Sequence, residues 1–186
     1  MTATQRLNVL SLHGVSGSGK DTLADIIHPV ADQSSYRLSF GYYLRTDVCL
    51  SLSIYSPPEN EREVVPGTGM TFKEHMVRVG RQMALRDPLR YVRMVERELD
   101  ELSEFSPLDR LVVCTDCRRP AEFRMLLDHP SINLWAVRLP TREGLRPMPL
   151  DHLLDDYRGI KQLMSGTPAD YLEQVMDHLI RTQPIN

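Results

Sequence analysis

A glycine-rich segment near the start of the chain, G-V-S-G-S-G-K over 14–20, constrains the fold more than any other part of the sequence. Its three glycines allow the backbone to turn its N–H groups inward and to approach an anion closely. The apolar run over 7–12 predicts a buried strand before it, and the pattern from Thr22 predicts a helix after it. Strand, glycine loop and helix in this order predict a phosphate-binding loop, with Lys20 directed at the β- and γ-phosphates of a nucleoside triphosphate.

One position departs from the usual form of this loop. A hydroxyl normally follows the lysine and holds Mg²⁺, but here Asp21 takes that position and Thr22 follows it. A carboxylate also binds a hard divalent cation, directly or through water, so both residues are candidate metal ligands and the choice between them stays open. We expect the following residues to contact the triphosphate and its metal: Gly14, Ser16, Gly17, Ser18, Gly19, Lys20, Asp21 and Thr22.

Composition limits the class of protein. With 186 residues, 41% hydrophobic and 25% charged, the chain suits one soluble domain with a full core. No apolar run approaches the roughly 20 residues of a membrane span, and no signal-peptide pattern opens the chain, so we expect a cytoplasmic protein without a membrane partner. The net charge of −3 gives no global attraction to nucleic acid. The C-x-x-C at 114–117 has no second pair, so we expect packed thiols and no zinc site.

Beyond the loop, the chain alternates predicted strands and helices. Strands are expected over 36–40, 110–115 and 132–137, and helices over 41–50, 71–86, 88–102 and from Pro168 onward. Thr71 and Glu74 have the spacing of a capping box at the start of one helix. The segment 53–71, rich in proline and glycine, predicts a long exposed loop of the kind that forms a lid or a mobile flap.

An acidic residue ends the predicted strand at 110–115. Asp116 follows this apolar run, and folds with a phosphate loop often place such a carboxylate beside the metal. Arg118 and Arg119 come next, so we expect Lys20, Asp116 and Arg118 to meet at the carboxyl edge of the sheet, where open α/β sheets bind ligands. Arg119 has a second interpretation, as a surface residue at the start of the next helix.

Two further arginine-rich segments are candidate binding regions. On the helix over 71–86, Arg78, Arg81 and Gln82 share a face opposite the apolar stripe and could read a phosphate and a base, although a solvated face also explains them. The segment 138–149 is rich in arginine and proline, and predicts either an arginine-bearing lid that includes Arg142 or a basic surface loop.

Taken together, these segments resemble the phage-type deoxynucleoside monophosphate kinases, in the adenylate-kinase-like branch of the P-loop kinases. The matching segments are S-G-K-D-T at 18–22, L-S-F-G-Y-Y-L-R at 38–45, V-G-R-Q at 79–82 and C-T-D-C-R-R-P-A-E at 114–122. Three C-terminal segments, D-Y at 156–157, S-G-T at 165–167 and L-E-Q-V at 172–175, resemble the base-contacting loop and final helix found there and in dephospho-CoA kinases. The chain departs from the family where G-Y-Y lacks its proline and where A-E replaces Asn-Glu.

The resemblance implies an α/β fold, a P-loop kinase three-layer sandwich with a central parallel five-stranded sheet flanked by helices. One kinase domain would span 1–186, with a mobile acceptor-binding insertion over about 41–103 and an arginine-bearing lid over about 139–150. The implied reaction is transfer from ATP, with Mg²⁺, to a deoxynucleoside monophosphate, giving ADP and a diphosphate. The location would be the cytoplasm, or the host cytoplasm if a phage encodes the protein.

The resemblance also implies roles for individual residues. Lys20, Asp116 and Arg118 would be catalytic, and the metal would lie near Asp21, Thr22 and Asp116. Further ATP contacts would come from Arg142, Gly166 and Thr167. The acceptor would be bound by Phe40, Tyr43, Arg45, Arg78, Arg81, Gln82 and Arg119.

Three alternatives stay open. A related phage kinase that phosphorylates hydroxymethyluracil in DNA would need a carboxylate to accept the hydroxyl proton, and aromatic platforms such as Tyr42, Tyr43 and Tyr55. Phosphomevalonate kinases of the animal type share S-G-K-D and the D-x-R-R element. A nucleotide sensor without catalysis would lack a catalytic acid or arginine, whereas Asp116 and Arg118 are both present. The base, the sugar preference and the oligomeric state, including a homodimer, also stay open.

Overall fold

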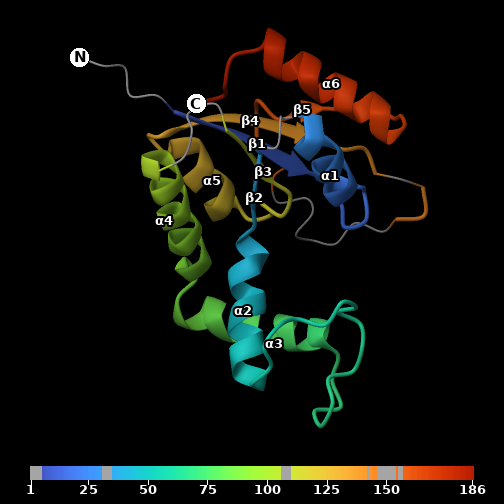
Figure 1. Ribbon diagram of the computed structural model, residues 1–186, viewed down its shortest axis with the longest axis vertical. Coiled ribbons are helices and arrows are strands. Elements are labelled where there is room, and N and C mark those ends of the chain that lie inside the picture. The colour runs from blue at the N-terminus through green and yellow to red at the C-terminus, as the bar shows by residue number, and fades with distance from the viewer. Residues whose placement is uncertain (1–5, 31–34, 106–109, 142, 146–153, 155–156) are drawn as a thin grey trace. The chain divides into compact units, whose positions relative to one another are not determined.

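The computed structural model describes residues 6–30, 35–105, 110–141, 143–145, 154 and 157–186 (Figure 1). The chain divides into two compact units. The first unit comprises 1–39 and 96–186, and the second unit comprises Phe40–Val95. A single kinase domain over 1–186, with an insertion over about 41–103, stays a prediction.

The first unit contains a sheet of five parallel strands. They are β1 (Leu7–His13), β2 (Tyr36–Leu38), β3 (Leu111–Cys114), β4 (Ile132–Arg138) and β5 (Lys161–Gln162), in the spatial order β2-β3-β1-β4-β5. β1 pairs along its length with both neighbours, for example Asn8 with Leu111 and Leu10 with Trp135. The predicted fold class, a central parallel five-stranded sheet flanked by helices, is confirmed.

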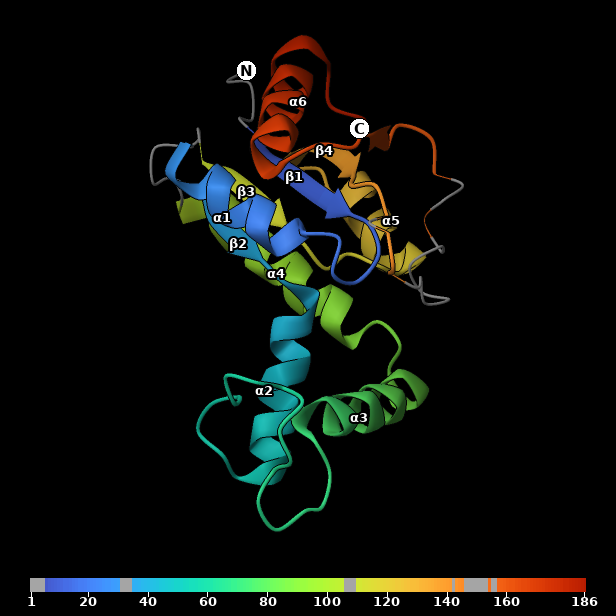
Figure 2. The same ribbon diagram turned by 90° about the vertical axis from the view of Figure 1, so that its right-hand side faces the viewer.

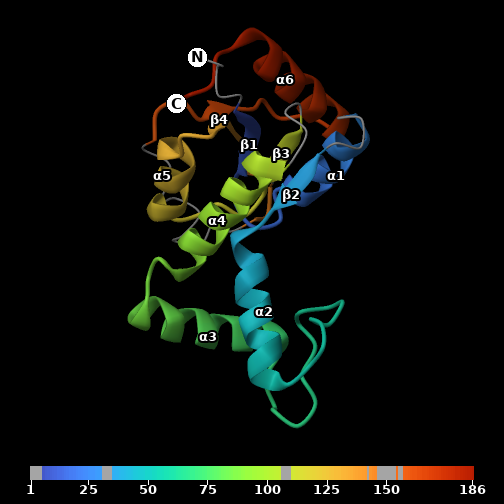
Figure 3. The same ribbon diagram turned by 60° about the vertical axis from the view of Figure 1, so that its left-hand side comes forward.

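Helices cover both faces of this sheet (Figures 1 and 3). α1 (Lys20–Val30) and α6 (Pro168–Arg181) lie on one face, while α5 (Pro120–Asp128) and the last part of α4 (Arg90–Phe105) lie on the other. The central strands β1, β3 and β4 are largely buried and mostly apolar, because both faces of the sheet are covered. The core between α1, α6 and the sheet includes Leu10, Leu12, Leu23, Ile27, Val137, Tyr171 and Val175.

The second unit is built from α2 (Phe40–Leu52), α3 (Phe72–Arg86) and the start of α4, and α2 packs against α3 (Figure 3). Its apolar core contains Val48, Cys49, Val65, Phe72 and Val79. The predicted capping box is confirmed: the Thr71 hydroxyl accepts from the Glu74 amide at 3.2 Å, and the Glu74 carboxylate accepts from the Thr71 amide at 2.7 Å.

Some predicted boundaries are wrong by a few residues. β2 ends at Leu38, so Phe40 begins α2 and does not belong to a strand. β5 has two exposed residues, too few to show a periodic pattern in the sequence.

Within the described parts of the chain, no helix combines the length and apolar character that crossing a membrane requires.

Candidate phosphate-binding site

The glycine-rich loop follows the tip of β1 and leads into α1 (Figure 2). Gly14 has φ 134°, and a Cβ added to it would lie 2.8 Å from Ser18 Oγ and 3.1 Å from the Leu139 carbonyl oxygen. Gly17 has φ 84°, also in the left-handed region. A side chain at Gly14 would therefore strain the backbone and fill the concave face of the loop, which supports the predicted role of glycine there.

Lys20 is the first residue of α1, and its ammonium lies inside the loop. Nζ donates to the carbonyl oxygens of Gly14 and Val15, both at 2.8 Å, and to Ser18 Oγ at 3.4 Å. The Lys20 side chain is buried, as is Ser18, whereas Ser16 and Gly17 are exposed. A buried cation surrounded by neutral oxygens is a favourable partner for an anion that enters the loop.

Asp116 lies just after β3, at the same edge of the sheet. The Ser39 hydroxyl donates to Asp116 Oδ2 at 2.6 Å, and the Cys114 thiol lies 3.8 Å from Oδ1. Ser39 follows β2, the parallel neighbour of β3, so the ends of two adjacent strands meet at this carboxylate. Burial raises the pKa of the Cys114 and Cys117 thiols well above the usual value, which is consistent with the predicted packed thiols.

Asp21 and Thr22, the two candidate metal ligands, have different surroundings. The Thr115 hydroxyl donates to Asp21 Oδ1 at 3.0 Å, and the Arg37 guanidinium forms an ion pair with the same carboxylate. Both residues are exposed, but Asp21 is bonded to the residue directly before Asp116. Of the two, Asp21 is better placed to act together with Asp116.

The chemistry of these donors fits a magnesium ion that is bound together with a nucleotide. Among the described residues, no group of three or more His, Cys, Asp or Glu side chains gathers in a way that could hold a metal. Mg²⁺ in phosphate-transferring sites is usually bound by one or two carboxylates, with the other ligands supplied by phosphate oxygens and water. Asp21 and Asp116 match that requirement.

The arginines after Asp116 differ in exposure. Arg118 is half-buried, and its Nε has no hydrogen-bond partner in the described part of the chain. Arg119 is exposed and is the N-cap residue of α5, with its Nε 3.9 Å from Glu122 Oε1. This position fits the second interpretation of Arg119, as a surface residue at a helix start, and leaves its acceptor role a prediction.

His13 was not singled out by the sequence analysis, yet it lies directly before the loop. Its ring packs edge-on against Phe123, with centroids 5.4 Å apart. Burial, with the nearby charges of Arg138 and Lys20, lowers the His13 pKa to about 3, although a hydrogen bond to the Cys117 backbone opposes the shift. The ring is neutral near pH 7 and joins the start of the loop to the turn after β3. Its position at the end of a central strand was the signal that could have identified it.

The predicted lid lies only partly within the described residues. Arg142 is outside them, as is the range 146–150. Leu145 belongs to the described part, and its Cδ2 would be 3.3 Å from a Cβ on Gly17, so this side chain packs over the phosphate loop. The arginines of this segment carried the prediction, and nothing in the sequence pattern indicated this apolar contact.

Gly166 and Thr167, predicted to contact ATP, lie at the start of α6. The Thr167 hydroxyl accepts from the Asp170 amide at 3.3 Å, and the Asp170 carboxylate accepts from the Thr167 amide at 2.7 Å. These contacts form a capping box, and the structure gives Thr167 no described contact with the phosphate loop. A role in binding ATP stays a prediction for both residues.

Most predicted acceptor residues lie in the second unit. Phe40 is buried, and Tyr43 is half-buried with its ring edge-on to Tyr42 at 5.4 Å. Arg45 Nε donates to Glu61 Oε1 at 2.7 Å, and Arg78 is 3.0 Å from His75 Nδ1. Arg81 and Gln82 are exposed on α3 beside Arg78, as the helical spacing predicted. Their acceptor roles stay predictions.

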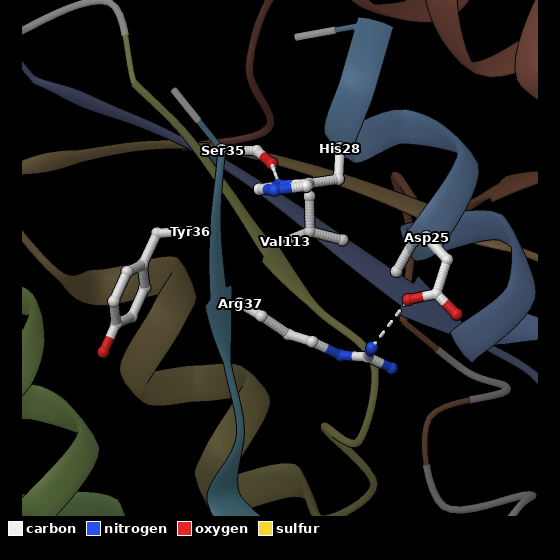
Figure 4. A pocket seen from close by; sticks show the side chains of 7 residues that line it. Asp25, His28, Ser35, Tyr36, Arg37 and Val113 are labelled. Carbon is white, nitrogen blue, oxygen red and sulfur yellow. Dashed lines mark hydrogen bonds and ion pairs between the residues drawn. The ribbon is translucent and has the colours of Figure 1, made fainter. Parts of the chain in front are cut away.

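A pocket of about 270 Å³ lies between α1 and β2 (Figure 4). Arg37 donates to Asp25 Oδ1 at 3.0 Å there, and His28 Nδ1 is hydrogen-bonded to Ser35. Because the polar groups on the wall of this pocket bind one another, they do not define a ligand, and the phosphate loop is the better candidate site.

No protein-family model matches the chain, and no curated protein sequence matches it. Among solved structures, a gluconokinase from Sinorhizobium meliloti is similar over 95% of this chain and 94% of its own, with 13% identity and a TM-score of 0.49. The APS kinase CysC of Mycobacterium tuberculosis, as a cysteine-to-alanine mutant, is similar over 94% and 98%, with 13% identity and a TM-score of 0.46. A shikimate kinase from Acinetobacter baumannii, with shikimate bound, is similar over 96% of both chains, with 12% identity and a TM-score of 0.43. Likenesses at these values carry no argument about reaction or substrate.

Proposed function

We propose that the protein transfers the γ-phosphoryl group of ATP, in the presence of Mg²⁺, to a deoxynucleoside monophosphate. The products would be ADP and a deoxynucleoside diphosphate. The observation that carries the phosphotransfer is the Lys20 ammonium, which is buried inside a glycine loop and held by the Gly14 and Val15 carbonyls. Such a loop at a helix N-terminus suits a polyphosphate, because amides, helix dipole and lysine all favour negative charge. The acceptor class is supported by the sequence resemblance.

The residues at the phosphate loop and at the end of β3 have separate roles in the proposed reaction. The loop amides and Lys20 would bind the β- and γ-phosphates, and Asp21 and Asp116 would hold the metal, with the Thr22 hydroxyl as the other candidate ligand. Bound Mg²⁺ would supply neutralisation of phosphate charge. Arg118 stabilises the negative charge on the transferred phosphoryl group. These roles require orientation and fixed charge, and no covalent intermediate.

The acceptor side needs cations and no general base. A phosphate monoester has a second pKa near 6, so it is already largely ionised near neutral pH when it attacks. Arg45 and Arg81 grip this acceptor phosphate, which requires Arg45 to exchange its present partner, Glu61, for the ligand. Phe40 and Tyr43 would contact the base.

A second candidate acceptor is a hydroxymethyl group on a base within DNA, and the exposed face of α3 favours it. The exposed side of α3, which we call the α3 face, carries four cations without a carboxylate partner in the described chain, Lys73, Arg78, Arg81 and Arg86, and one exposed carboxylate, Glu74. The carboxylates of Asp47, Glu61 and Asp87 are each paired with an arginine elsewhere in the second unit.

The length of the α3 face exceeds what one phosphate needs. At about 1.5 Å per residue, the helix between its first and last cation extends for roughly 20 Å, whereas one or two cations suffice for a single phosphate. Tyr55 is fully exposed, with a relative accessibility of 104%, and Tyr42 is 61% exposed. Exposed aromatic rings and rows of cations are both typical components of single-stranded nucleic acid binding.

A panel of acceptors tests the proposal. The protein is incubated with labelled ATP and each deoxynucleoside monophosphate, with an oligonucleotide containing hydroxymethyluracil, and with mevalonate phosphate. Labelling of one monophosphate supports the leading proposal, and labelling of the oligonucleotide alone replaces it with the second candidate. ATP binding without acceptor-stimulated release of ADP would point instead to a nucleotide sensor. Lys20→Ala is the control in every reaction.

A further inference from the structure

Glu122 in the first turn of α5 is a buried carboxylate with no role in the proposed chemistry. One of its oxygens, Oε2, accepts from the Arg118 amide at 2.8 Å and from the Arg119 amide at 2.9 Å. Only 12% of its side chain is exposed. Two charge-assisted bonds to consecutive peptide groups fix the direction of the chain at that point.

The same residue also caps α5, and the other capping boxes show how it differs from an ordinary cap. In α3 and α6 the capping carboxylates, Glu74 and Asp170, are exposed, and each binds the amide and hydroxyl of its own N-cap residue. Glu122 is buried, and it also binds the amide of Arg118, the residue before the N-cap. Burial raises the pKa of Glu122 and so disfavours its charged form, a cost that an exposed cap avoids. Capping alone does not explain this arrangement.

The rest of the turn after β3 is already anchored to other elements. The Thr115 hydroxyl is bonded to Asp21, and the Asp116 carboxylate to Ser39. The Cys117 backbone is hydrogen-bonded to His13. Arg118 and Arg119 complete the turn, and their amides are held by Glu122.

Arg118 depends on this support because its own side chain is poorly held. Its Nε is buried without a hydrogen-bond partner in the described residues, so the backbone largely decides where the guanidinium points. We propose that Glu122 is a positioning residue, which holds the Arg118 backbone so that the guanidinium stays at the carboxyl edge of the sheet. The inference rests on the proposed function, in which Arg118 stabilises the transferred phosphoryl group.

Two substitutions separate the position of the oxygen from its charge. Glu122→Gln keeps an acceptor oxygen at the same place and removes the charge. Glu122→Asp keeps the charge and withdraws the oxygen by one methylene. We expect kcat of the Gln variant to stay within about threefold of wild type, and that of the Asp variant to fall by about 10²-fold, since small misplacements of a catalytic group cost that much. The KM for ATP should change little in both. Equal loss in the two variants, or greater loss with Gln, would overturn the proposal.

A double-mutant cycle tests whether Glu122 acts through Arg118. Arg118→Ala and Glu122→Asp are measured alone and together, and we expect the double variant to be no slower than Arg118→Ala, because the two changes remove one shared function. Additive losses contradict the positioning role. Full activity of Arg118→Ala contradicts the proposed function of Arg118 itself, whereas an inactive Arg118→Ala with a fully active Glu122→Asp contradicts only the positioning role.

The control is the equivalent cap on α3. Glu74→Asp shortens an exposed capping carboxylate in the same way, and should lower the melting temperature slightly while leaving kcat unchanged. If Glu122→Asp lowers the melting temperature as Glu74→Asp does and spares kcat, Glu122 is only a helix cap and the inference is wrong.

Discussion

The carboxyl edge of the sheet and the α3 face carry similar charged residues in opposite surroundings. At the sheet edge, Lys20, Asp21 and Asp116 are each bonded to a neighbouring element, and Lys20 is buried. On the α3 face, Arg81 and its neighbouring cations are exposed and have no carboxylate partner among the described residues. Fixed charges suit groups that must stabilise a transition state, because they need not reorganise during reaction. Exposed cations suit recognition of an anion that supplies the missing charge.

The strongest way to break this comparison is to remove the buried cation. Lys20→Ala should lower kcat/KM for phosphoryl transfer by about 10³-fold, since removing one preorganised electrostatic group typically costs 10² to 10³. Arg81→Ala on α3 is the matched control, and should affect binding of the acceptor more than binding of ATP. Steady-state kinetics with varied ATP measures the effect. Full transfer by Lys20→Ala would show that the glycine loop is not the site of reaction.

The shape of the loop is the next target. Gly14→Ala puts a Cβ at a φ of 134° and 2.8 Å from Ser18 Oγ, so the loop must distort. Strain of this kind costs about 1–3 kcal/mol, and we expect ATP binding measured by calorimetry to weaken on the order of 100-fold once the contact is included. Gly67→Ala is the control, because its φ of 78° is also positive but nothing lies within 4 Å. Equal affinity in both variants would mean that the loop does not bind the nucleotide.

The pH dependence of stability tests whether His13 is buried in its neutral form at the carboxyl edge of the sheet. Its pKa of about 3 in the folded protein lies below the ordinary value of 6.5, so between these values the unfolded chain binds more protons. The free energy of unfolding should therefore fall as the pH is lowered, by about 2 kcal/mol at pH 5 relative to pH 7.5 from this group alone. Urea unfolding of the wild type and of His13→Asn at both pH values isolates the contribution of His13 to the free energy of unfolding, since the variant has no imidazole to titrate. Parallel pH dependences in the two proteins would mean that His13 is not buried in its neutral form.

The smallest effect is expected on the α3 face. Arg81→Ala should raise the KM for the acceptor about tenfold and leave kcat and the KM for ATP nearly unchanged, because one exposed cation adds binding and no transition-state charge. Arg93→Ala, which removes an arginine already paired with Asp87, is the control. A fall in kcat without a change in KM would place Arg81 among the catalytic groups and remove the distinction between the two regions.

Local sequence predicted the parts of the fold that depend on neighbouring residues. The strand over 7–12, the glycine loop and the capping box at Thr71 each depend on short-range spacing, and each is present in the structure. The strand at 161–162 was missed because it depends on contacts made elsewhere. A two-residue strand exists only through its neighbour β4.

The candidate site shows the same division. Lys20, Asp116 and Arg118 could be selected from the sequence, because phosphate chemistry requires particular residue types after particular strands. Ser39 and Thr115 could not, since serine and threonine have no distinctive pattern until the strand ends are brought together.

The sequence by itself determined the glycine loop, its lysine and the alternation of strands and helices. The conformational freedom of glycine and the spacing of apolar residues depend only on residues close together in the chain. Only the tertiary structure decided which groups hold them in place: Ser39 against Asp116 and Thr115 against Asp21. The physical reason is that a hydrogen bond requires two atoms within about 3 Å, and residues up to 94 positions apart reach that distance only when parallel strands align their ends.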